Sequence, residues 1–586
     1  MKSLQKTKQT GYQTRELLLK TYEISDLVLA AKTQLKDNQL YLDQNITKNI
    51  LERYSELKDI NLRVLRSSDD KANVNTIMDI IPIKTKKKGS LGSGCTVELD
   101  GIVVMLTAKE EGGKQVAEFG STEGKMIENI AFDMPGCPDQ NDIILNLDMV
   151  IETGISMTRE GPTACHRAAD EIIQEIRDEM KVGLYEEDCK TTQIIRETPV
   201  DPYNNYPDQS NQHDKPNGSK VILVKEMMGQ GGMHDNIILP LEPCGVIGGK
   251  SVVDMGNIPL MLSPNEVKDG AIHAMTCVAP STKETTRHYS RDPLVERLDE
   301  DEKLHLNGII AVGSPQSNHE KEYTAKRVGM MIEKIAPDGV IVMTEGYGNN
   351  HIDFAKHIEE VGKRDIPVVG VTYAAKKGAL IIGNKYMDAM VELSKDTKRY
   401  SKNKAHKASS DKGTEVLGEN TLIGDDADRA ISMLKSKIND DVVNIKSEIP
   451  VPEIPPVVWA EPPKTLKHSD VALVSAAGVH LKEQEPFNVA GDNSYRIIPG
   501  DVDSRELMVT HGGYDHKDVR KDINCMFPTD RLKELSQEGF IKSQAKLHIG
   551  FMGGGGDFEA FNDYVGPEIA RELSRVGAGV AVLTAG

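Results

Sequence analysis

The sequence predicts an α/β protein in three parts: an α+β N-terminal segment, a mostly parallel doubly wound sheet domain, and a second, incomplete α/β domain after a proline-rich linker. Two observations support this prediction. Between residues 220 and 395, apolar β-branched runs alternate with stretches of helical spacing, as buried parallel strands alternate with crossover helices. Around residue 450, a high density of prolines excludes a helix and favours an extended tether.

The first part is expected to span residues 1–219 as an α+β segment. Residues 10–60 mix apolar positions at helical spacing with charged residues, and short β-rich runs follow them. One of these runs, TVELDGIVVMLTA, turns at its Asp-Gly pair. Apolar positions at helical spacing predict a helix over residues 167–180, and a polar, turn-rich loop over residues 203–219 ends the segment.

The second part, residues 220–440, is predicted to form the doubly wound sheet. Its buried strands are expected in KVILVKE, GIIAVGS, GVIVMTEG and IPVVGVTYA, with helices between them and another helix near residues 426–438. Active sites of such sheets lie at the carboxyl ends of the strands. Those ends carry Ser314, Glu345 and Gly346, so we expect a functional site there.

The third part, residues 467–586, follows the linker at residues 441–466. VALVSAAGV, KLHIGFMGG and GVAVLTAG are typical of buried strands, and PEIARELSRVG is typical of a helix. The last strand lacks the crossover element that would follow it in a parallel sheet. We therefore expect this α/β domain to be incomplete.

Composition excludes several classes of partner. The formal net charge is -19, which provides no positive field to attract nucleic acid or anionic lipid. The N-terminus lacks the continuous apolar core of a secretory signal, and no run approaches the ~18 apolar residues of a membrane span. We expect a cytoplasmic protein that binds neither nucleic acid nor membrane.

The seven cysteines are scattered and odd in number, which fits neither a disulfide framework nor a zinc CxxC cluster. Free thiols are therefore expected. Cys525 could act as a resolving thiol, but a buried structural cysteine is the favoured interpretation. His511 and His516 lie in a polar stretch that is better explained as a solvated turn than as a metal site. No metal site is predicted.

The segment AIHAMTCVAPSTKETTRHY, residues 271–289, concentrates reactive side chains. Composition alone favours a buried structural role for its cysteine, Cys277. Chemistry offers an alternative, in which the Cys277 thiol attacks the carbonyl carbon of Thr276 with a nearby histidine as base. The resulting thioester would undergo β-elimination, which breaks the chain and leaves dehydroalanine. Hydrolysis would then yield a pyruvoyl group at the new N-terminus.

The loop TEGYGNNHIDF also admits two interpretations. Asn349, Asn350 and Asp353 could simply cap helices, as asparagine and aspartate do at loop-to-helix junctions. However, two adjacent amides together with Glu345 and His351 exceed what capping requires. The residues alone leave a structural and a functional loop equally open.

Longer motifs resemble a known enzyme family. EFGSTEG, GPTACHRA, KEMMGQGGMHDNIILPLEP, DGAIHAMTC, RHYSRDPLV, VGSPQSN and TEGYGNNHIDF are similar to the D-proline reductase proprotein family across residues 75–440. In the family's motif HALTC, Met275 replaces leucine and the cysteine falls on Cys277, while Ala279 and Cys165 replace glycine and alanine. Beyond the linker, MVTHGGYDHKDVRKDINCMFPTDRL and HIGFMGGGGDFEAF resemble the selenoprotein subunit of the same reductase. Both belong to the superfamily of glycine, sarcosine and betaine reductase component B.

The resemblance implies a mechanism. The family forms a pyruvoyl cofactor from the cysteine at the position of Cys277 and reductively opens D-proline to 5-aminovalerate. The pyruvoyl carbonyl withdraws electrons from the ring nitrogen, a selenol attacks Cα, a neighbouring thiol frees the product, and an external dithiol resets the pair. The selenocysteine is expected immediately after Gly586. The family also implies a dithiol or thioredoxin-like electron donor protein, a hetero- or homo-oligomeric complex, and a place in amino-acid fermentation.

Residue types suggest which side chains bind the substrate and which transfer protons. Arg287 is expected to bind the substrate carboxylate, because a guanidinium binds carboxylates through two parallel hydrogen bonds. His273 and His288 are candidate proton carriers for processing or turnover. Glu345 or His351 could protonate the departing nitrogen.

Three alternatives stay open. Component B of glycine, sarcosine or betaine reductase shares the self-cleaving cysteine and the selenoprotein. A cysteine-type N-terminal-nucleophile amidohydrolase would keep a free amine and thiol at the new N-terminus instead of a carbonyl. A chain that ends at residue 586 would be a non-catalytic scaffold.

Overall fold

The computed structural model shows two compact units, Met1–Glu453 and Ile454–Gly586, and the division between them falls inside the predicted linker. Most of the predicted loop over residues 203–219 lies outside the described residues. The described residues are 15–69, 71–112, 124–155, 160–197, 218–227, 259–274, 285–315, 317–346, 350–373, 382–393, 416–418, 421–441, 445–449, 465–489, 491–511, 516, 518–553 and 560–584.

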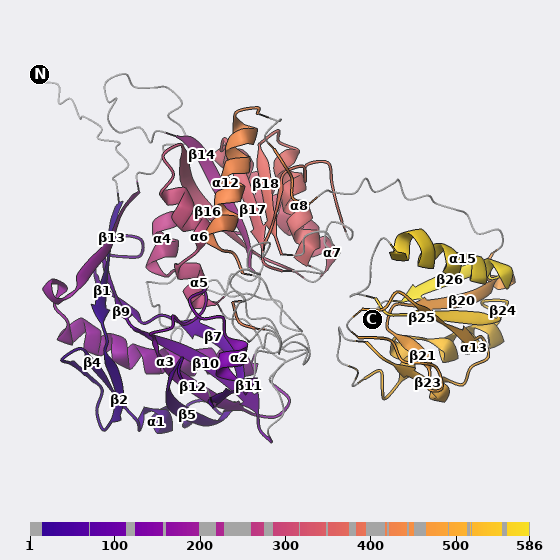
Figure 1. Cartoon of the computed structure of the whole chain (residues 1–586), viewed down its shortest axis with the longest axis horizontal. Coiled ribbons are helices and arrows are strands. Elements are labelled where there is room, and N and C mark those ends of the chain that lie inside the picture. Colours follow the sequence, from indigo (N-terminus) through magenta and orange to yellow (C-terminus); the bar gives the residue numbers. More distant parts are fainter. Residues whose placement is uncertain are drawn as a thin grey trace, which may run out of the picture. The chain divides into compact units, whose positions relative to one another are not determined.

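The N-terminal part of the first unit contains two four-stranded sheets and a long helix (Figure 1). The sheets have the strand orders β13-β1-β9-β8 and β5-β12-β10-β7, and the buried face of α3 packs into a core that both sheets share. The helix predicted over residues 167–180 is confirmed as part of α3. The elements are β1 (Arg15–Glu23), β2 (Asp26–Ala30), β3 (Gln34–Lys36), β4 (Gln39–Asp43), α1 (Ile46–Leu51), β5 (Leu57–Arg66), β6 (Asn73–Val74), β7 (Thr76–Ile81), β8 (Lys84–Lys88), β9 (Gly94–Asp100), β10 (Ile102–Glu110), β11 (Gly124–Lys125), α2 (Met126–Asn129), β12 (Ile143–Ile151), α3 (Glu160–Gly183), η1 (Glu186–Asp188) and β13 (Lys190–Glu197).

The helical spacing predicted near the start of the chain is wrong for β1. This segment is a strand that pairs with β13 along one edge and with β9 along the other. Leu17 is fully buried between these neighbours. Pairing on both edges outweighs the weak intrinsic preference of leucine-rich segments for helix, because the tertiary context decides such cases.

The second part of the first unit is a six-stranded sheet with the order β15-β16-β14-β17-β18-β19, and five of its strands run parallel. Helices α4, α5, α6 and α12 pack on one face and α7 and α8 on the other, which confirms the doubly wound arrangement. The elements are β14 (Ser219–Met227), β15 (Leu260–Leu262), α4 (Pro264–Asp269), α5 (Thr286–Ser290), α6 (Pro293–Asp299), β16 (Leu304–Gly313), α7 (Asn318–Ile335), β17 (Gly339–Thr344), α8 (Asn350–Gly362), β18 (Val368–Thr372), β19 (Met390–Glu392) and α12 (Gly424–Ile438).

A buried carboxylate joins the two parts of the first unit. Asp269, at the end of α4, accepts the backbone N–H of Gly92 over 2.7 Å, the hydroxyl of Thr96 over 2.5 Å and the ammonium group of Lys86 over 2.5 Å. These donors lie on or beside β8 and β9 of the N-terminal sheet. The parts predicted to meet at residues 219 and 220 are therefore tied into one compact body.

The second unit is also an α/β fold. Its central strand β20 pairs in parallel with β24, β25 and β26, and β22 pairs antiparallel with β25. The elements are η3 (Leu466–His468), β20 (Asp470–Ser475), β21 (Val479–Leu481), β22 (Tyr495–Pro499), η4 (Ser504–Glu506), β23 (Leu507–Val509), η5 (Ile523–Cys525), α13 (Thr529–Gln537), β24 (Ser543–Gln544), β25 (Leu547–Phe551), η6 (Phe561–Val565), α15 (Gly566–Arg575) and β26 (Val580–Thr584).

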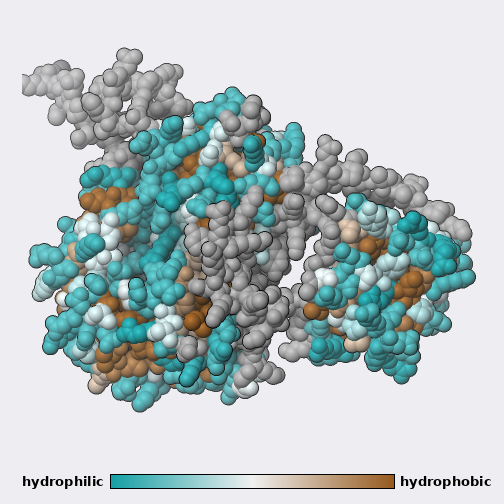
Figure 2. All heavy atoms as spheres, in the orientation of Figure 1, coloured by the Kyte–Doolittle hydropathy of each residue, from teal (hydrophilic) through white to brown (hydrophobic). Residues whose placement is uncertain are grey.

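The five cysteines in the described part of the chain are free thiols, as predicted, but the buried position expected for Cys525 is wrong. Cys525 ends the short helix η5, in which only Ile523 turns into the core, so its thiol is exposed. Hydrophilic side chains cover most of the visible face of each unit, with separate hydrophobic patches between them (Figure 2). Among the described helices, none combines the length and apolar character that crossing a bilayer requires.

Candidate active site

The order of the parallel strands indicates where a ligand site belongs. Of the six strands in this sheet, β14 comes first in the chain. It lies inside the sheet, with β16 on one side and β17, β18 and β19 on the other. Sheet growth therefore changes direction at β14, and in sheets of this type ligands bind outside the carboxyl ends of the strands at such a switch point. Here the carboxyl ends of β14 and β17 lie next to each other.

Four buried polar side chains form what we call the switch-point cluster: Lys225, His288, Asp292 and Glu345. His288 Nε2 lies 3.1 Å from a carboxylate oxygen of Glu345 and 3.4 Å from the Lys225 ammonium nitrogen, and Lys225 also donates to Asp292. The backbone N–H of Leu422 donates to the same oxygen of Glu345 over 2.9 Å. The structure thus brings His288 and Glu345, both predicted site residues, into contact from α5 and from the end of β17.

Short capped helices hold these side chains in place. The hydroxyl of Thr285 accepts the backbone N–H of His288 over 3.1 Å and so caps α5. Asp292 caps α6 through one oxygen, which accepts the N–H groups of Leu294 and Val295, and receives Lys225 on the other. One aspartate therefore both starts a helix and pairs with a buried lysine, whose charge would otherwise be costly to bury.

The charge of Glu345 is set by its neighbours. Burial raises the pKa of Glu345, but the charge and hydrogen bond of His288, with Lys225 nearby, outweigh burial and hold that pKa below its usual range. Glu345 is therefore a carboxylate at neutral pH and a poor proton donor. In the described part of the chain, no hydrogen-bond partner reaches His288 Nδ1 or Glu345 Oε2, although both atoms are buried.

The segment that contains Thr276 and Cys277 has both of its ends anchored on one buried carboxylate. Thr276 and Cys277 themselves lie outside the described residues. The backbone N–H of Ala274 donates to the hydroxyl of Thr286 over 2.9 Å. Thr286 in turn donates its N–H and its hydroxyl to the two oxygens of Asp79, over 2.8 and 2.7 Å. The two flanks of the segment are thus held together on β7.

Two histidines complete the surroundings of Asp79. His166 Nδ1 lies 3.1 Å from His273 Nε2, and these nitrogens lie 3.9 and 3.8 Å from Asp79 Oδ2. Burial raises the pKa of Asp79 to about 8 against the hydrogen bonds from Thr286, and burial lowers the pKa of His273 to about 3. Of the three, only His273 was predicted from the sequence. The motif GPTACHRA contains His166 and was the only available signal for it.

Arg287 has different surroundings from those predicted. Its guanidinium donates to Asp142 over 2.5 Å and to Asp139 over 2.7 Å, and its side chain is 3% exposed. Two carboxylates of the protein therefore bind the terminal nitrogens that a substrate carboxylate would need. Binding of a substrate carboxylate by Arg287 stays a prediction. In the structure, Arg287 forms an ion pair that connects α5 to the turn before β12.

Family models together cover nearly the whole chain. One described as glycine/sarcosine/betaine reductase component B subunits matches residues 15–400, and one described as glycine/sarcosine/betaine reductase selenoprotein B matches residues 294–586. The chain belongs to this component B family. No solved structure matches it significantly.

Several curated proteins resemble this component B chain. It is 41% identical to the D-proline reductase proprotein PrdA of Acetoanaerobium sticklandii over 432 residues, which cover 74% of this chain and 64% of that protein. It is 56% identical to D-proline reductase subunit gamma of the same organism over 145 residues, which cover 25% of this chain and 60% of that subunit. It is 24% identical to the sarcosine reductase complex component B subunit alpha of Peptoclostridium acidaminophilum, with coverage of 60% and 77%. The chain thus spans less than two thirds of the length of either D-proline reductase relative.

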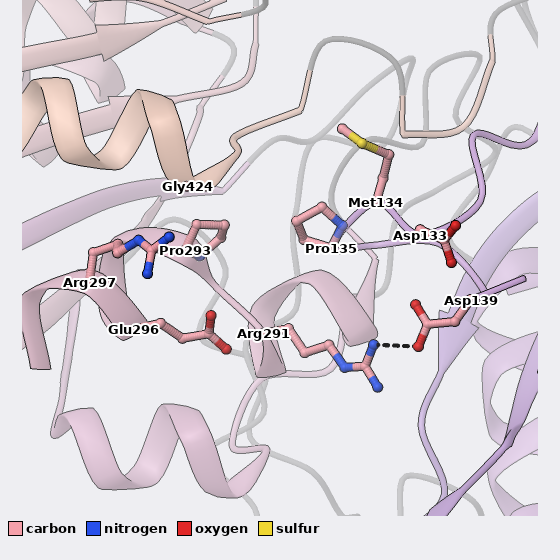
Figure 3. A pocket seen from close by; sticks show the side chains of 9 residues that line it. All are labelled: Asp133, Met134, Pro135, Asp139, Arg291, Pro293, Glu296, Arg297 and Gly424. Atoms are coloured by element: carbon pink, nitrogen blue, oxygen red, sulfur yellow. Dashed lines mark hydrogen bonds and ion pairs between the residues drawn. The ribbon is translucent and has the colours of Figure 1, made fainter. Parts of the chain in front are cut away.

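The component B chain also contains a cavity of about 300 Å³ beside α6 and the start of α12 (Figure 3). Carboxylates and guanidiniums line much of it, and Arg291 donates to Asp139 over 3.0 Å at its edge. None of the predicted catalytic residues that the structure describes lines this cavity, so it is distinct from the switch-point cluster. The lining residues are Asp133, Met134, Pro135, Asp139, Arg291, Pro293, Glu296, Arg297 and Gly424.

A further group of buried polar side chains lies on α7, on α8 and just after β16 of this component B fold. Lys321 donates to Asp353, and Ser314 donates to the same carboxylate oxygen over 2.7 Å. His351 and His357 are fully buried, and neither ring has a hydrogen-bond partner among the described residues. Burial lowers the pKa of His351 to about 4 and that of His357 to about 3. Both imidazoles are therefore neutral at physiological pH.

We expect His357→Leu to reduce the loss of stability on acidification. Because the folded-state pKa is lowered to about 3, the unfolded chain gains a proton below the ordinary pKa of 6.5 that the folded chain does not, so stability falls as pH falls. Between pH 7 and pH 5, His357 should account for a decrease of about 2 kcal/mol in the free energy of unfolding. Urea unfolding of the first unit at both pH values measures the difference.

The exposed His319 provides the matched control, and His319→Leu should keep the pH dependence of the wild-type protein. Equal losses of stability between pH 7 and pH 5 in His357→Leu and in the wild-type protein would contradict the lowered pKa.

Proposed function

We propose that this component B chain is a D-proline reductase proprotein. In this proposal it cleaves itself between Thr276 and Cys277, forms a pyruvoyl group, and reductively opens D-proline to 5-aminovalerate. The observation that carries the proposal is the 41% identity to the D-proline reductase proprotein, against 24% to the sarcosine reductase subunit. The 56% identity of a 145-residue stretch to D-proline reductase subunit gamma agrees with it.

The proposed cleavage needs only water as a reagent. The Cys277 thiol attacks the Thr276 carbonyl carbon, and the peptide nitrogen leaves to give a thioester. A base removes the Cα proton of residue 277, the Cβ–S bond breaks, and sulfur leaves with the Thr276 acyl group. Water then replaces the nitrogen, which departs as ammonia. The hydrogen bonds at Ala274 and Thr286 support this proposal, because they would keep the two flanks of the segment together once the bond is cut.

The switch-point cluster is the proposed site of turnover. A pyruvoyl group supplies an electron sink for the substrate amine. His288 Nδ1 and Glu345 Oε2 are buried polar atoms that, within the described residues, need a partner, and a polar substrate would provide one. We assign proton transfer to the departing nitrogen to His288. Glu345 holds and orients that imidazole instead of donating the proton, since its pKa is lowered. His351 is buried, and because burial lowers its pKa to about 4 it is neutral and, like Glu345, a poor proton donor at neutral pH.

Ring opening breaks the C–N bond at Cα and consumes two electrons and two protons. A selenol of the complete reductase would supply the nucleophile, and a dithiol donor protein would supply the two electrons as it is oxidised to a disulfide. This chemistry requires other subunits or donor proteins. The names of the relatives support such an assembly, because one of them is called glycine reductase complex component B subunits alpha and beta.

Replacing Cys277 with alanine should abolish both chain cleavage and carbonyl formation, because no thiol remains to attack Thr276. Denaturing gel electrophoresis measures the cleavage, and labelling with a fluorescent hydrazide measures the carbonyl. Cys525→Ala is the matched control, since this thiol is exposed and lies in the other unit, and it should be cleaved as the wild type is. A Cys277→Ala chain that is still cut would refute the proposal.

Glu345→Gln should lower kcat for D-proline by about 10²- to 10⁴-fold and leave chain cleavage intact, because glutamine carries no charge to hold and orient His288. Steady-state kinetics of the cleaved holoenzyme with dithiothreitol as reductant measure this effect. Glu300→Gln removes an exposed carboxylate and should keep the wild-type kcat. If Glu345→Gln reduces D-proline at the wild-type rate, Glu345 has no part in turnover.

Substrate tests separate this proposal from its rivals. The holoenzyme with dithiothreitol should convert D-proline to 5-aminovalerate and leave glycine, sarcosine and betaine unchanged, as measured by chromatography of the products. Reduction of one of those three compounds instead would identify the corresponding component B activity. A cleaved chain with an N-terminal amine and thiol would identify the amidohydrolase.

A further inference from the structure

The polar atoms around Asp79 have the spacing of a metal site. Asp79 Oδ2, His166 Nδ1 and His273 Nε2 lie 3.1, 3.8 and 3.9 Å apart. A point equidistant from the three atoms lies about 2.1 Å from each of them, which is the distance at which zinc binds imidazole nitrogen and carboxylate oxygen. A hydrogen bond between the two imidazoles would account for the shortest distance only, whereas a shared ion accounts for all three.

The ligand types also suit a metal ion. Two imidazoles with one carboxylate are a recurrent ligand set of catalytic zinc sites and of non-haem iron sites, and both kinds of site keep at least one position open. Thr286 donates to both oxygens of Asp79 and thereby fixes the orientation of the carboxylate. Hydrogen bonds of this kind to a ligand are a regular feature of metal sites.

The three ligands come from separate elements and are nearly inaccessible to water. Asp79 lies on β7, His166 on α3, and His273 follows α4. The side chains of Asp79 and His166 are 0% exposed and that of His273 is 11% exposed, so the open side of the group is at His273. An ion bound here would join the two parts of the first unit at one point.

We propose that Asp79, His166 and His273 bind one divalent ion of the zinc class. Such an ion uses the Nε2 lone pair of His273, so this nitrogen does not also carry a proton. The site therefore assigns His273 a role different from the proton carrier predicted from its place in the sequence. The inference concerns these three side chains and does not depend on D-proline reductase activity.

Metal content tests the proposal directly. The full-length protein, loaded with zinc chloride and dialysed against metal-free buffer, should retain about one zinc ion per chain by plasma mass spectrometry. His166→Ala and Asp79→Asn should each retain less than about a tenth of an ion, because two protein ligands do not hold zinc against dialysis. His319→Ala removes an exposed imidazole and should retain as much as the wild type.

A second measurement covers the case in which these variants do not fold. Adding zinc chloride to the wild-type protein after treatment with a chelator should raise its midpoint of thermal unfolding, since an ion that binds only the folded state stabilises it. A wild-type chain that retains no zinc and shows no such shift would overturn the proposal, as would a folded His166→Ala chain that retains the ion. Neither readout involves cleavage or turnover, so failure here is distinguishable from failure of the proposed function.

Discussion

The hydrogen bonds between Thr286 and Asp79 connect the two parts of the first unit and anchor the segment between Ala274 and Thr286. Asp79 belongs to the N-terminal sheets, and Thr286 begins a helix of the doubly wound part. Burying a carboxylate without donors is costly, and here one residue satisfies both of its oxygens. The same threonine hydroxyl accepts the backbone N–H of Ala274. One buried acid therefore positions both flanks of the segment that contains Thr276 and Cys277.

Helix α5 extends this anchoring to the switch point. Three consecutive residues of this short helix bind three different places: Thr286 binds Asp79, Arg287 binds the turn before β12, and His288 binds Glu345. A displacement of the helix would disturb all three contacts together. Thr286, which flanks the segment that contains Thr276 and Cys277, and the switch-point cluster are therefore linked through α5. Under the proposed function, this coupling would keep the switch-point cluster in place when the bond between Thr276 and Cys277 is cut.

The sequence indicates a strand correctly where both faces of the strand are buried. It is misleading where pairing with strands that are distant in the sequence determines the secondary structure. The run GVIVMTEG is continuous and apolar because β17 is covered on both faces, so it could be identified from composition. β1 was mispredicted because its two strand partners lie far away in the sequence. Asp79 and His166 could not be grouped with His273, since only folding brings them together. The role of Glu345 also needed the structure, because the contact with His288 lowers its pKa and makes it a poor acid.

The central claim is that the peptide bond between Thr276 and Cys277 is cut and that residue 277 becomes a pyruvoyl group. Intact mass of the protein from its natural host, measured under denaturing conditions, tests this claim most directly. Two polypeptides are predicted, and the second should begin at residue 277 with the mass of a cysteine N-terminus less hydrogen sulfide and ammonia plus water. A single uncut polypeptide, or a second polypeptide that still begins with an intact cysteine, would contradict the claim.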